Sequence, residues 1–142
     1  MSNQNFKNHA RYIPLWHFII PTGILTVVIC GIVTAMNSVH ETRTIAILIT
    51  ILALALILVW FYARNFALRA QDRAIRAEEN FRHFILTGKP HDTRLRLGQI
   101  IALRFASDGE MPALAIRAVE EKLAPKQIKT IIQQWRADYY RV

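Results

Sequence analysis

Residues 44–63 read TIAILITILALALILVWFYA, and residues 64–86 continue the chain as RNFALRAQDRAIRAEENFRHFIL. These 43 residues contain neither glycine nor proline, the two residues that most strongly interrupt a helix. At 1.5 Å per residue, one helix over the whole stretch would span ~65 Å, against ~30 Å for the hydrocarbon of a bilayer. The first segment has no charged residue, whereas the second has five arginines. The stretch therefore predicts a transmembrane helix that continues into the cytoplasm as a basic stalk.

Another apolar segment precedes this stretch. Residues 18–36 are 19 residues without a charge, which meets the length needed to cross a bilayer. Pro21, Gly23 and Gly31 interrupt the segment, but membrane helices tolerate these residues. A cleaved signal peptide is the alternative, with residues 33–35 as a small-residue cleavage site. Because the leader before the segment is long for a signal peptide, we expect a retained span and hence a hairpin of two transmembrane helices.

Basic residues indicate the orientation of this hairpin. Lys7 and Arg11 precede the first span, Arg43 lies alone in the loop at residues 37–43, and the five arginines follow the second span. Basic residues collect on the cytoplasmic side of membrane proteins. Aromatic side chains favour the headgroup layer, and they flank the same two ends of the spans, as Tyr12, Trp16 and Phe18 and as Trp60, Phe61 and Tyr62. We therefore expect both termini in the cytoplasm.

Most of the net charge follows the second span. The chain has 142 residues, of which 53% are hydrophobic, and a net charge of +8. From residue 64 onward there are 15 Lys and Arg against 9 Asp and Glu, a difference of +6. Basic side chains beside a membrane attract anionic lipid headgroups, at about 1 kcal/mol per well-placed residue. We expect such contacts, or at least a role in setting the topology, for Arg64, Arg69, Arg73 and Arg76.

The predicted stalk has two different faces. Apolar residues recur at intervals of three and four, the spacing of one helix face, at Phe66, Ala70, Ala74, Ala77, Phe81 and Phe84, with Ile85 beside them. On the polar side, Asp72–Arg76 and Glu78–Arg82 have the i,i+4 spacing of intrahelical ion pairs. The apolar face needs a cover, which the downstream helices, the membrane surface or the same face of another subunit can provide. For this packing we single out Phe66, Ala77, Phe81 and Phe84.

Shorter helices are predicted after the stalk. Gly88 and Pro90 end the long helix, because glycine readily adopts the left-handed cap and proline cannot continue a helix. Three helices follow, over about residues 93–106, 112–123 and 125–140, each with one apolar face. The last one places five large side chains on that face: Ile128, Ile131, Ile132, Trp135 and Tyr139. These faces can form one small core.

The expected fold is therefore an all-α membrane protein in six parts. They are a cytoplasmic N-terminal segment (1–17), the first span (18–36), an extracytoplasmic loop (37–43), the second span (44–63), a juxtamembrane stalk helix (64–87) and a cytoplasmic helical tail domain (88–142). Small residues four apart, Gly31 with Ala35 and Ala46 with Thr50, allow close approach of helices. Such pairs serve contacts within one hairpin and contacts between subunits equally well.

The sequence contains no recognisable catalytic or metal-binding motif. There is no glycine-rich phosphate loop, no nucleophile elbow and no zinc-type Cys/His spacing. Cys30 is the single cysteine, and the five histidines are scattered, at His9, His17, His40, His83 and His91. The two spans contain no Asp, Glu, Lys, Arg or His, the groups that proton relays and haem ligation by histidine require. We therefore expect no enzymatic activity, no cofactor and no metal.

Two weaker alternatives concern the cytoplasmic part. An enzyme acting at the membrane surface would need the polar cluster Asp72, Arg73, Arg76, Glu78 and Glu79, which intrahelical pairs and stalk contacts explain better. The last two predicted helices could form a helix-turn-helix that exposes Lys126, Lys129, Arg136 and Arg141. Acidic residues interleave with these four, so nucleic-acid binding is not expected.

Five stretches carry a resemblance to a known family: residues 5–9 (NFKNH), 62–64 (YAR), 71–79 (QDRAIRAEE), 97–108 (LGQIIALRFASD) and 135–138 (WRAD). The chain resembles a family of small bacterial membrane proteins of unknown function, found chiefly among Bacteroidota. The resemblance covers nearly the whole chain. It implies a bacterial inner-membrane protein with two spans and a helical cytoplasmic tail, and it brings no catalytic or binding residues.

The expected function is that of a non-enzymatic inner-membrane protein. It would act as a self-associating scaffold or as an accessory subunit of a membrane complex, through its stalk and cytoplasmic helices. The alternative is a small oligomeric pore or transporter formed by the hairpins. A pore requires a polar lining, for which the spans offer only Thr22, Thr26, Thr34 and Thr50.

Overall fold

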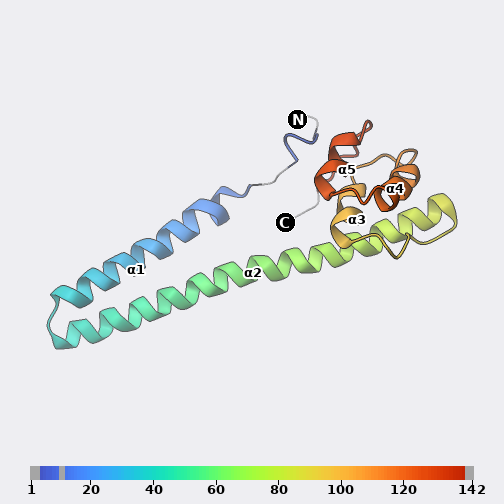
Figure 1. The fold of residues 1–142 in the computed structure, drawn as a ribbon. Coiled ribbons are helices and arrows are strands. Elements are labelled where there is room, and N and C mark those ends of the chain that lie inside the picture. Colours follow the sequence, from blue (N-terminus) through green and yellow to red (C-terminus); the bar gives the residue numbers. More distant parts are fainter. Residues whose placement is uncertain (1–3, 10–11, 140–142) are drawn as a thin grey trace. The chain divides into compact units, whose positions relative to one another are not determined.

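The structure, a computed structural model, describes residues 4–9 and 12–139 (Figure 1). Its elements in chain order are the π-helix η1 (Leu15–Ile19) and the α-helices α1 (Ile20–Asn37), α2 (His40–Thr87), α3 (Leu97–Leu103), α4 (Met111–Glu120) and α5 (Pro125–Ile131). No strand occurs in the described part of the chain, so the all-helical prediction is confirmed. Two of the basic residues named above, Arg11 and Arg141, lie outside the described residues, as does residue 140 at the predicted end of the last helix.

The chain divides into two compact units. Residues 12–67 form one unit, which we call the hairpin unit, and residues 68–142 together with residues 1–11 form the other, which we call the tail unit. Helix α2 belongs to both, because its residues 40–67 lie in the hairpin unit and its residues 68–87 in the tail unit.

The hairpin unit consists of two antiparallel helical segments. Leu15–Asn37 and His40–Thr87 are both long and apolar enough to cross a membrane. Helix α2 begins at His40, inside the segment 37–43 that was predicted as a loop, so only Ser38 and Val39 separate the two α-helices. Most large apolar side chains of this unit are exposed. The unit therefore buries little apolar surface against itself.

Small residues bring the two segments together at one end of the hairpin. Gly31 and Ala46 are buried, and a Cβ atom at position 31 would collide with Thr50 Oγ1. The Thr50 hydroxyl is held there because it donates a hydrogen bond of 2.8 Å to the carbonyl oxygen of Ala46. Ala35, the other member of the predicted small pair, is half-buried. Close approach at Gly31 thus occurs within one hairpin.

Two tryptophans join the segments at the other end. Trp60 Nε1 donates a hydrogen bond of 3.0 Å to the main-chain oxygen of Trp16, and the two rings stack with centroids 6.0 Å apart. The oxygen of Trp16 is available because Ile20 N–H bonds to the oxygen of Leu15, and the next residue, Pro21, has no N–H to donate. This pair and the Gly31 contact hold the hairpin together.

Enlarging Gly31 is expected to loosen the hairpin. Gly31→Ile should destabilise the packed segments by about 1–3 kcal/mol, because the new side chain collides with the Ala46–Thr50 turn. Thermal unfolding of the full chain in detergent measures the effect. Gly23→Ile is the matched control, since a Cβ atom there meets nothing within 4 Å. Equal midpoints for the two variants would contradict the packing described.

Short helices form the core of the tail unit. Helices α3, α4 and α5 enclose a buried apolar cluster whose members are Leu95, Ile100, Ala102, Leu103, Ala106, Met111, Leu114, Ala115, Ala118 and Ile128. The buried Gln99 links the helices, because its Nε2 donates to the main-chain oxygens of Ala118 (3.1 Å) and Leu123 (2.9 Å). Its Oε1 accepts the N–H of Arg96 and so caps α3. Both ends of this amide are therefore used.

The third predicted tail helix is shorter than expected. Helix α5 ends at Ile131, and Ile132 already has extended backbone angles. The segment that follows pairs with the end of α3: Ala106 and Trp135 form an isolated antiparallel bridge, and Arg136 N–H donates to the oxygen of Phe105 at 2.7 Å. The prediction that Trp135 and Tyr139 continue a helical face is therefore wrong. The reason is that Trp135 stacks on Phe105, with centroids 4.6 Å apart, which a continuous helix would not provide.

Candidate interaction surface

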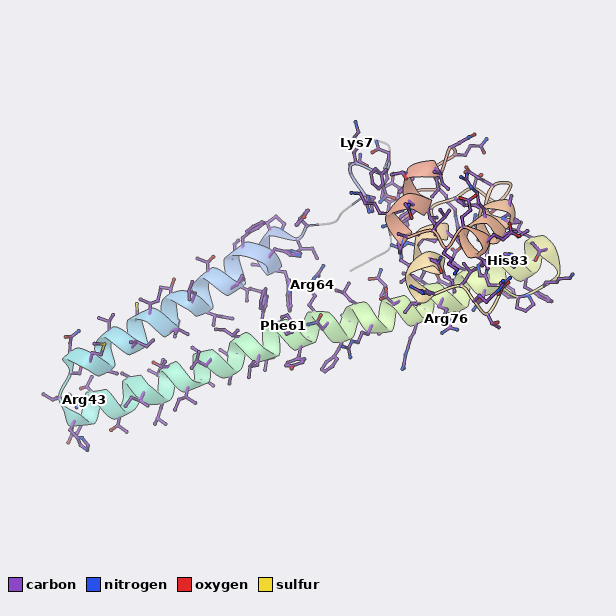
Figure 2. All side chains as sticks on the ribbon, viewed as in Figure 1. Lys7, Arg43, Phe61, Arg64, Arg76 and His83 are labelled. Atoms are coloured by element: carbon purple, nitrogen blue, oxygen red, sulfur yellow. The ribbon has the colours of Figure 1, made fainter. Side chains whose placement is uncertain are left out.

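Two contacts determine which surface of the tail unit remains for a partner. The short helices dock on α2, and the N-terminal segment docks on the short helices and the segment after them. Figure 2 marks Arg76 and His83 on the part of α2 that belongs to this unit.

An ion-pair cluster attaches the short helices to α2. Glu79 is only 5% exposed, and its carboxylate lies 2.9 Å from Arg82 Nη1 and 3.4 Å from Arg136 Nη1. Arg82 reaches further, because its Nε donates to Asp108 at 2.7 Å and its Nη2 to the main-chain oxygen of Ala106 at 2.7 Å. One arginine of α2 thus holds both a carboxylate of its own helix and the turn after α3.

This cluster corrects the predicted intrahelical pairs. Arg82 pairs with Glu79 and Asp108 instead of Glu78, and none of the ion pairs among the described residues contains Asp72 or Arg76. The i,i+4 spacing fails here because Asp108 and the buried Glu79 compete for the same guanidinium. Glu78 is consequently left exposed without a cation of its own helix.

The N-terminal segment also docks on the tail unit. Gln4 Nε2 donates to the main-chain oxygen of Asp138 at 2.9 Å, and Gln4 Oε1 accepts the N–H of Asp138 at 2.8 Å. His9 lies beside the rings of Phe105 and Trp135, at centroid distances of 5.7 and 5.9 Å. No local pattern in the sequence predicts these contacts. The related signal is that residues 5–9 and residues 135–138 both belong to the stretches that carry the family resemblance.

Cavities open between described residues of the tail unit. One, of about 490 Å³, has Ile75, Glu78 and Glu79 of α2 on one side and Arg104 and Arg136 on the other. The second, of about 370 Å³, lies at the end of α2, with walls that include His83, Thr87, Lys89, Arg94 and Glu120. In neither cavity, nor elsewhere in the described part of the chain, do three His, Cys, Asp or Glu side chains gather as they would to hold a metal ion.

His91 is buried near the second cavity. The residue is 6% exposed, and its ring lies against that of His83 with centroids 4.1 Å apart and a tilt of 32°. Neither ring nitrogen has a hydrogen-bond partner among the described residues. The pKa of His91 is lowered from its ordinary 6.5 to about 4, mainly by burial and in addition by the nearby His83 and Arg82. The ring is therefore neutral in the folded protein at neutral pH.

Acid is expected to destabilise the tail unit through His91. Below pH 6.5 the unfolded chain binds a proton that the folded chain takes up only near pH 4, so stability is complete above pH 6.5 and falls toward pH 4. We expect a loss of about 2 kcal/mol, less than the whole pKa difference implies because nearby solvent screens the charge. Hydrogen exchange of α3–α5 against pH measures it. His91→Leu should flatten the profile between pH 6.5 and 4, whereas the exposed His40→Leu should leave it unchanged.

The predicted packing residues of α2 remain exposed. In the tail unit, Phe81 is 66% and Phe84 52% exposed, and three alanines at helical spacing from them, Ala70, Ala74 and Ala77, are exposed as well. We call these five residues the outer face. The short helices instead contact the opposite side of α2, where Ile75 and Glu79 are buried. The described part of the chain's own tail therefore does not cover the outer face. In the hairpin unit, Phe66 is exposed too.

The predicted headgroup arginines are solvent-accessible. Arg69, Arg73 and Arg76 are exposed and Arg64 is half-buried, and none of the four takes part in an ion pair within the described ranges. Their guanidinium groups are thus available to ligands outside the chain.

Comparison with known proteins yields one match. A family model covers residues 1–142, and its description is "Family of unknown function (DUF6526)". The comparison with curated proteins and the comparison with solved structures each found no match.

Proposed function

Because the chain belongs to this family of unknown function over its whole length, it inherits no activity, and we propose a function from its geometry. The protein is a non-enzymatic, two-span protein of the bacterial inner membrane. It acts as a self-associating scaffold, or as an accessory subunit of a membrane complex, through α2 and the cytoplasmic tail. The observation that carries this proposal is the outer face, an apolar surface that the protein's own tail leaves uncovered.

Burial supports the membrane part of the proposal. A soluble protein would enclose two such apolar helices in a core, whereas most large side chains of Leu15–Asn37 and of the first half of α2 are exposed. A bilayer can cover that surface. Large exposed apolar surfaces otherwise mark interaction sites or aggregation.

Contacts of the N-terminal segment support an even number of spans. Gln4 bonds the backbone of Asp138, so the two ends of the chain meet in one folded unit. Ends that fold together must lie on the same side of a membrane, as they do in a hairpin. The arginines after the second span favour the cytoplasmic side.

The energetics of the outer face support association with a protein surface. Burying a phenylalanine side chain is worth about 1.5–3 kcal/mol. Two exposed phenylalanines per chain, Phe81 and Phe84, therefore provide a considerable driving force for contact with another protein surface.

The test is the oligomeric state of the full chain purified in detergent or nanodiscs. Mass photometry should find a dimer or a larger assembly. Phe81→Ser with Phe84→Ser should weaken association at least tenfold, because two buried rings are lost from each copy. Ile116→Ser is the matched control, since Ile116 is 60% exposed on α4, away from the outer face. A wild-type chain that runs as a lone monomer and binds no other protein would refute the proposal.

The pore alternative has less support. The hydroxyls of Thr26 and Thr50 donate to main-chain oxygens of their own helix, and Thr50 is partly covered within the hairpin. These groups are therefore poorly placed to line a wet channel. Ion flux in proteoliposomes would distinguish the two functions.

A further inference from the structure

The outer face has the spacing of a two-stranded coiled coil. Its residues follow one another at intervals of four, three, four and three, at positions 70, 74, 77, 81 and 84. This spacing corresponds to a period of 3.5 residues, which keeps one seam of a helix against a partner helix. Three alanine layers are followed by two phenylalanine layers, so a partner helix must approach closely at one end and accommodate rings at the other.

Charged residues flank the seam on its two sides. In heptad terms, with Ala74 at position a and Ala77 at position d, Arg73 occupies position g and Glu78 position e. In a parallel, in-register coiled coil, the g residue of one helix faces the e residue of the next heptad on the other helix. Arg73 of one copy would therefore face Glu78 of the second copy, and two-fold symmetry would repeat the pair.

Both charges are available for this contact. Arg73 and Glu78 are exposed, and neither forms an ion pair within the described part of the chain. Glu78 lacks its i+4 partner because Arg82 binds Glu79 and Asp108. The tail, which contacts Ile75 and Glu79, leaves the seam open.

We propose that α2 pairs with α2 of a second copy, parallel and in register, across the outer face, with reciprocal Arg73–Glu78 ion pairs. This inference rests on the proposed function, since it specifies the partner of the same surface. Membrane topology requires the parallel direction, because α2 is one helix that includes the second candidate span, and two copies inserted alike have α2 running the same way. When the two helices are in register, the alanines of one outer face lie opposite the alanines of the other, and the phenylalanines lie opposite the phenylalanines.

Cysteine cross-linking of the full chain in nanodiscs tests the register. In a Cys30→Ala background, Ala77→Cys places two thiols opposite each other across the seam, so mild oxidation should give a covalent dimer in high yield. Arg76→Cys is the matched control. Residue 76 is next to residue 77 in the chain but lies away from the seam, so this variant should give little cross-linked dimer. Equal yields from both variants would overturn the proposed register.

Charge exchange tests the ion pairs. Arg73→Glu or Glu78→Arg alone should weaken association about 5- to 10-fold at low salt, because each change places like charges opposite each other twice. The double variant Arg73→Glu with Glu78→Arg should restore wild-type association. Arg69→Glu, which changes an exposed charge off the seam, should not rescue Glu78→Arg.

The outcomes separate this inference from the proposed function. If the chain associates but the charge exchange gives no rescue and Ala77→Cys no cross-link, the contact lies elsewhere, and only the inference is wrong. A different protein that co-purifies through the outer face of a single copy would also overturn the inference alone. If the chain is a lone monomer without any partner, both proposals are wrong.

Discussion

Arg82→Ala is expected to release the short helices from α2, at a cost of about 3 kcal/mol in the stability of the tail unit. The substitution leaves the buried carboxylate of Glu79 with only the longer contact to Arg136, and it removes the donor to the oxygen of Ala106. Removing one partner from a buried ion pair is costly because the remaining charge stays desolvated. Hydrogen exchange of the α3–α5 amides in the full chain measures the loss.

Two comparisons make this result specific. Arg76→Ala removes an exposed arginine of the same helix without an ion pair, and it should change stability by less than about 0.5 kcal/mol. Adding Glu79→Gln to Arg82→Ala should recover part of the loss, since it removes the unpaired charge. A loss below about 1 kcal/mol for Arg82→Ala would mean that apolar packing alone attaches the tail to α2.

Phe105→Ala should have the largest effect of any single truncation in the tail unit. The ring is fully buried, stacks on Trp135 and lies 5.7 Å from His9, so its loss leaves a cavity and removes the surface on which residues 4–9 rest. Truncating a buried phenylalanine costs about 3–5 kcal/mol. Chemical denaturation measures this cost, and limited proteolysis should show faster cleavage at residues 4–9.

Phe84→Ala is the matched control for that truncation. The same chemical change at a ring that is 52% exposed on the outer face should cost little folding stability. It should instead weaken association between copies. If both truncations lowered folding stability equally, the outer face would be part of the folding core and could not serve as a free docking surface.

The long helix illustrates what local sequence can predict. Gly88 has a φ of 71°, in the left-handed region, so the expected glycine cap does end α2 at Thr87. Apolar residues at intervals of three and four indicated that α2 has an apolar side and a polar side. They did not indicate which side the tail would cover. That choice depends on Arg82, which reaches Asp108 and Ala106 far along the chain.

The end of the chain illustrates where such prediction fails. Ile128, Ile131 and Trp135 have helical spacing, yet α5 ends at Ile131. The chain leaves the helix there, and Trp135 stacks on Phe105 instead of extending the apolar face of α5. Contacts between residues some 130 apart, such as Gln4 with Asp138, have no local signature at all. Helical spacing is a property of neighbours, whereas these contacts form only when distant segments have already met.

The sequence by itself determined the two apolar segments, the unbroken helix that continues from the second of them, and the 3.5-residue spacing of the outer face. Each of these depends on residues within a few turns of one another. Tertiary structure alone decided that the described part of the tail leaves this face open, that Glu78 has no ion-pair partner among the described residues, and that the N-terminal segment joins the tail. The physical reason is that residues far apart in the chain compete with local partners. Asp108, together with Glu79, pairs with Arg82, and the ring of Phe105 packs against Trp135 and His9.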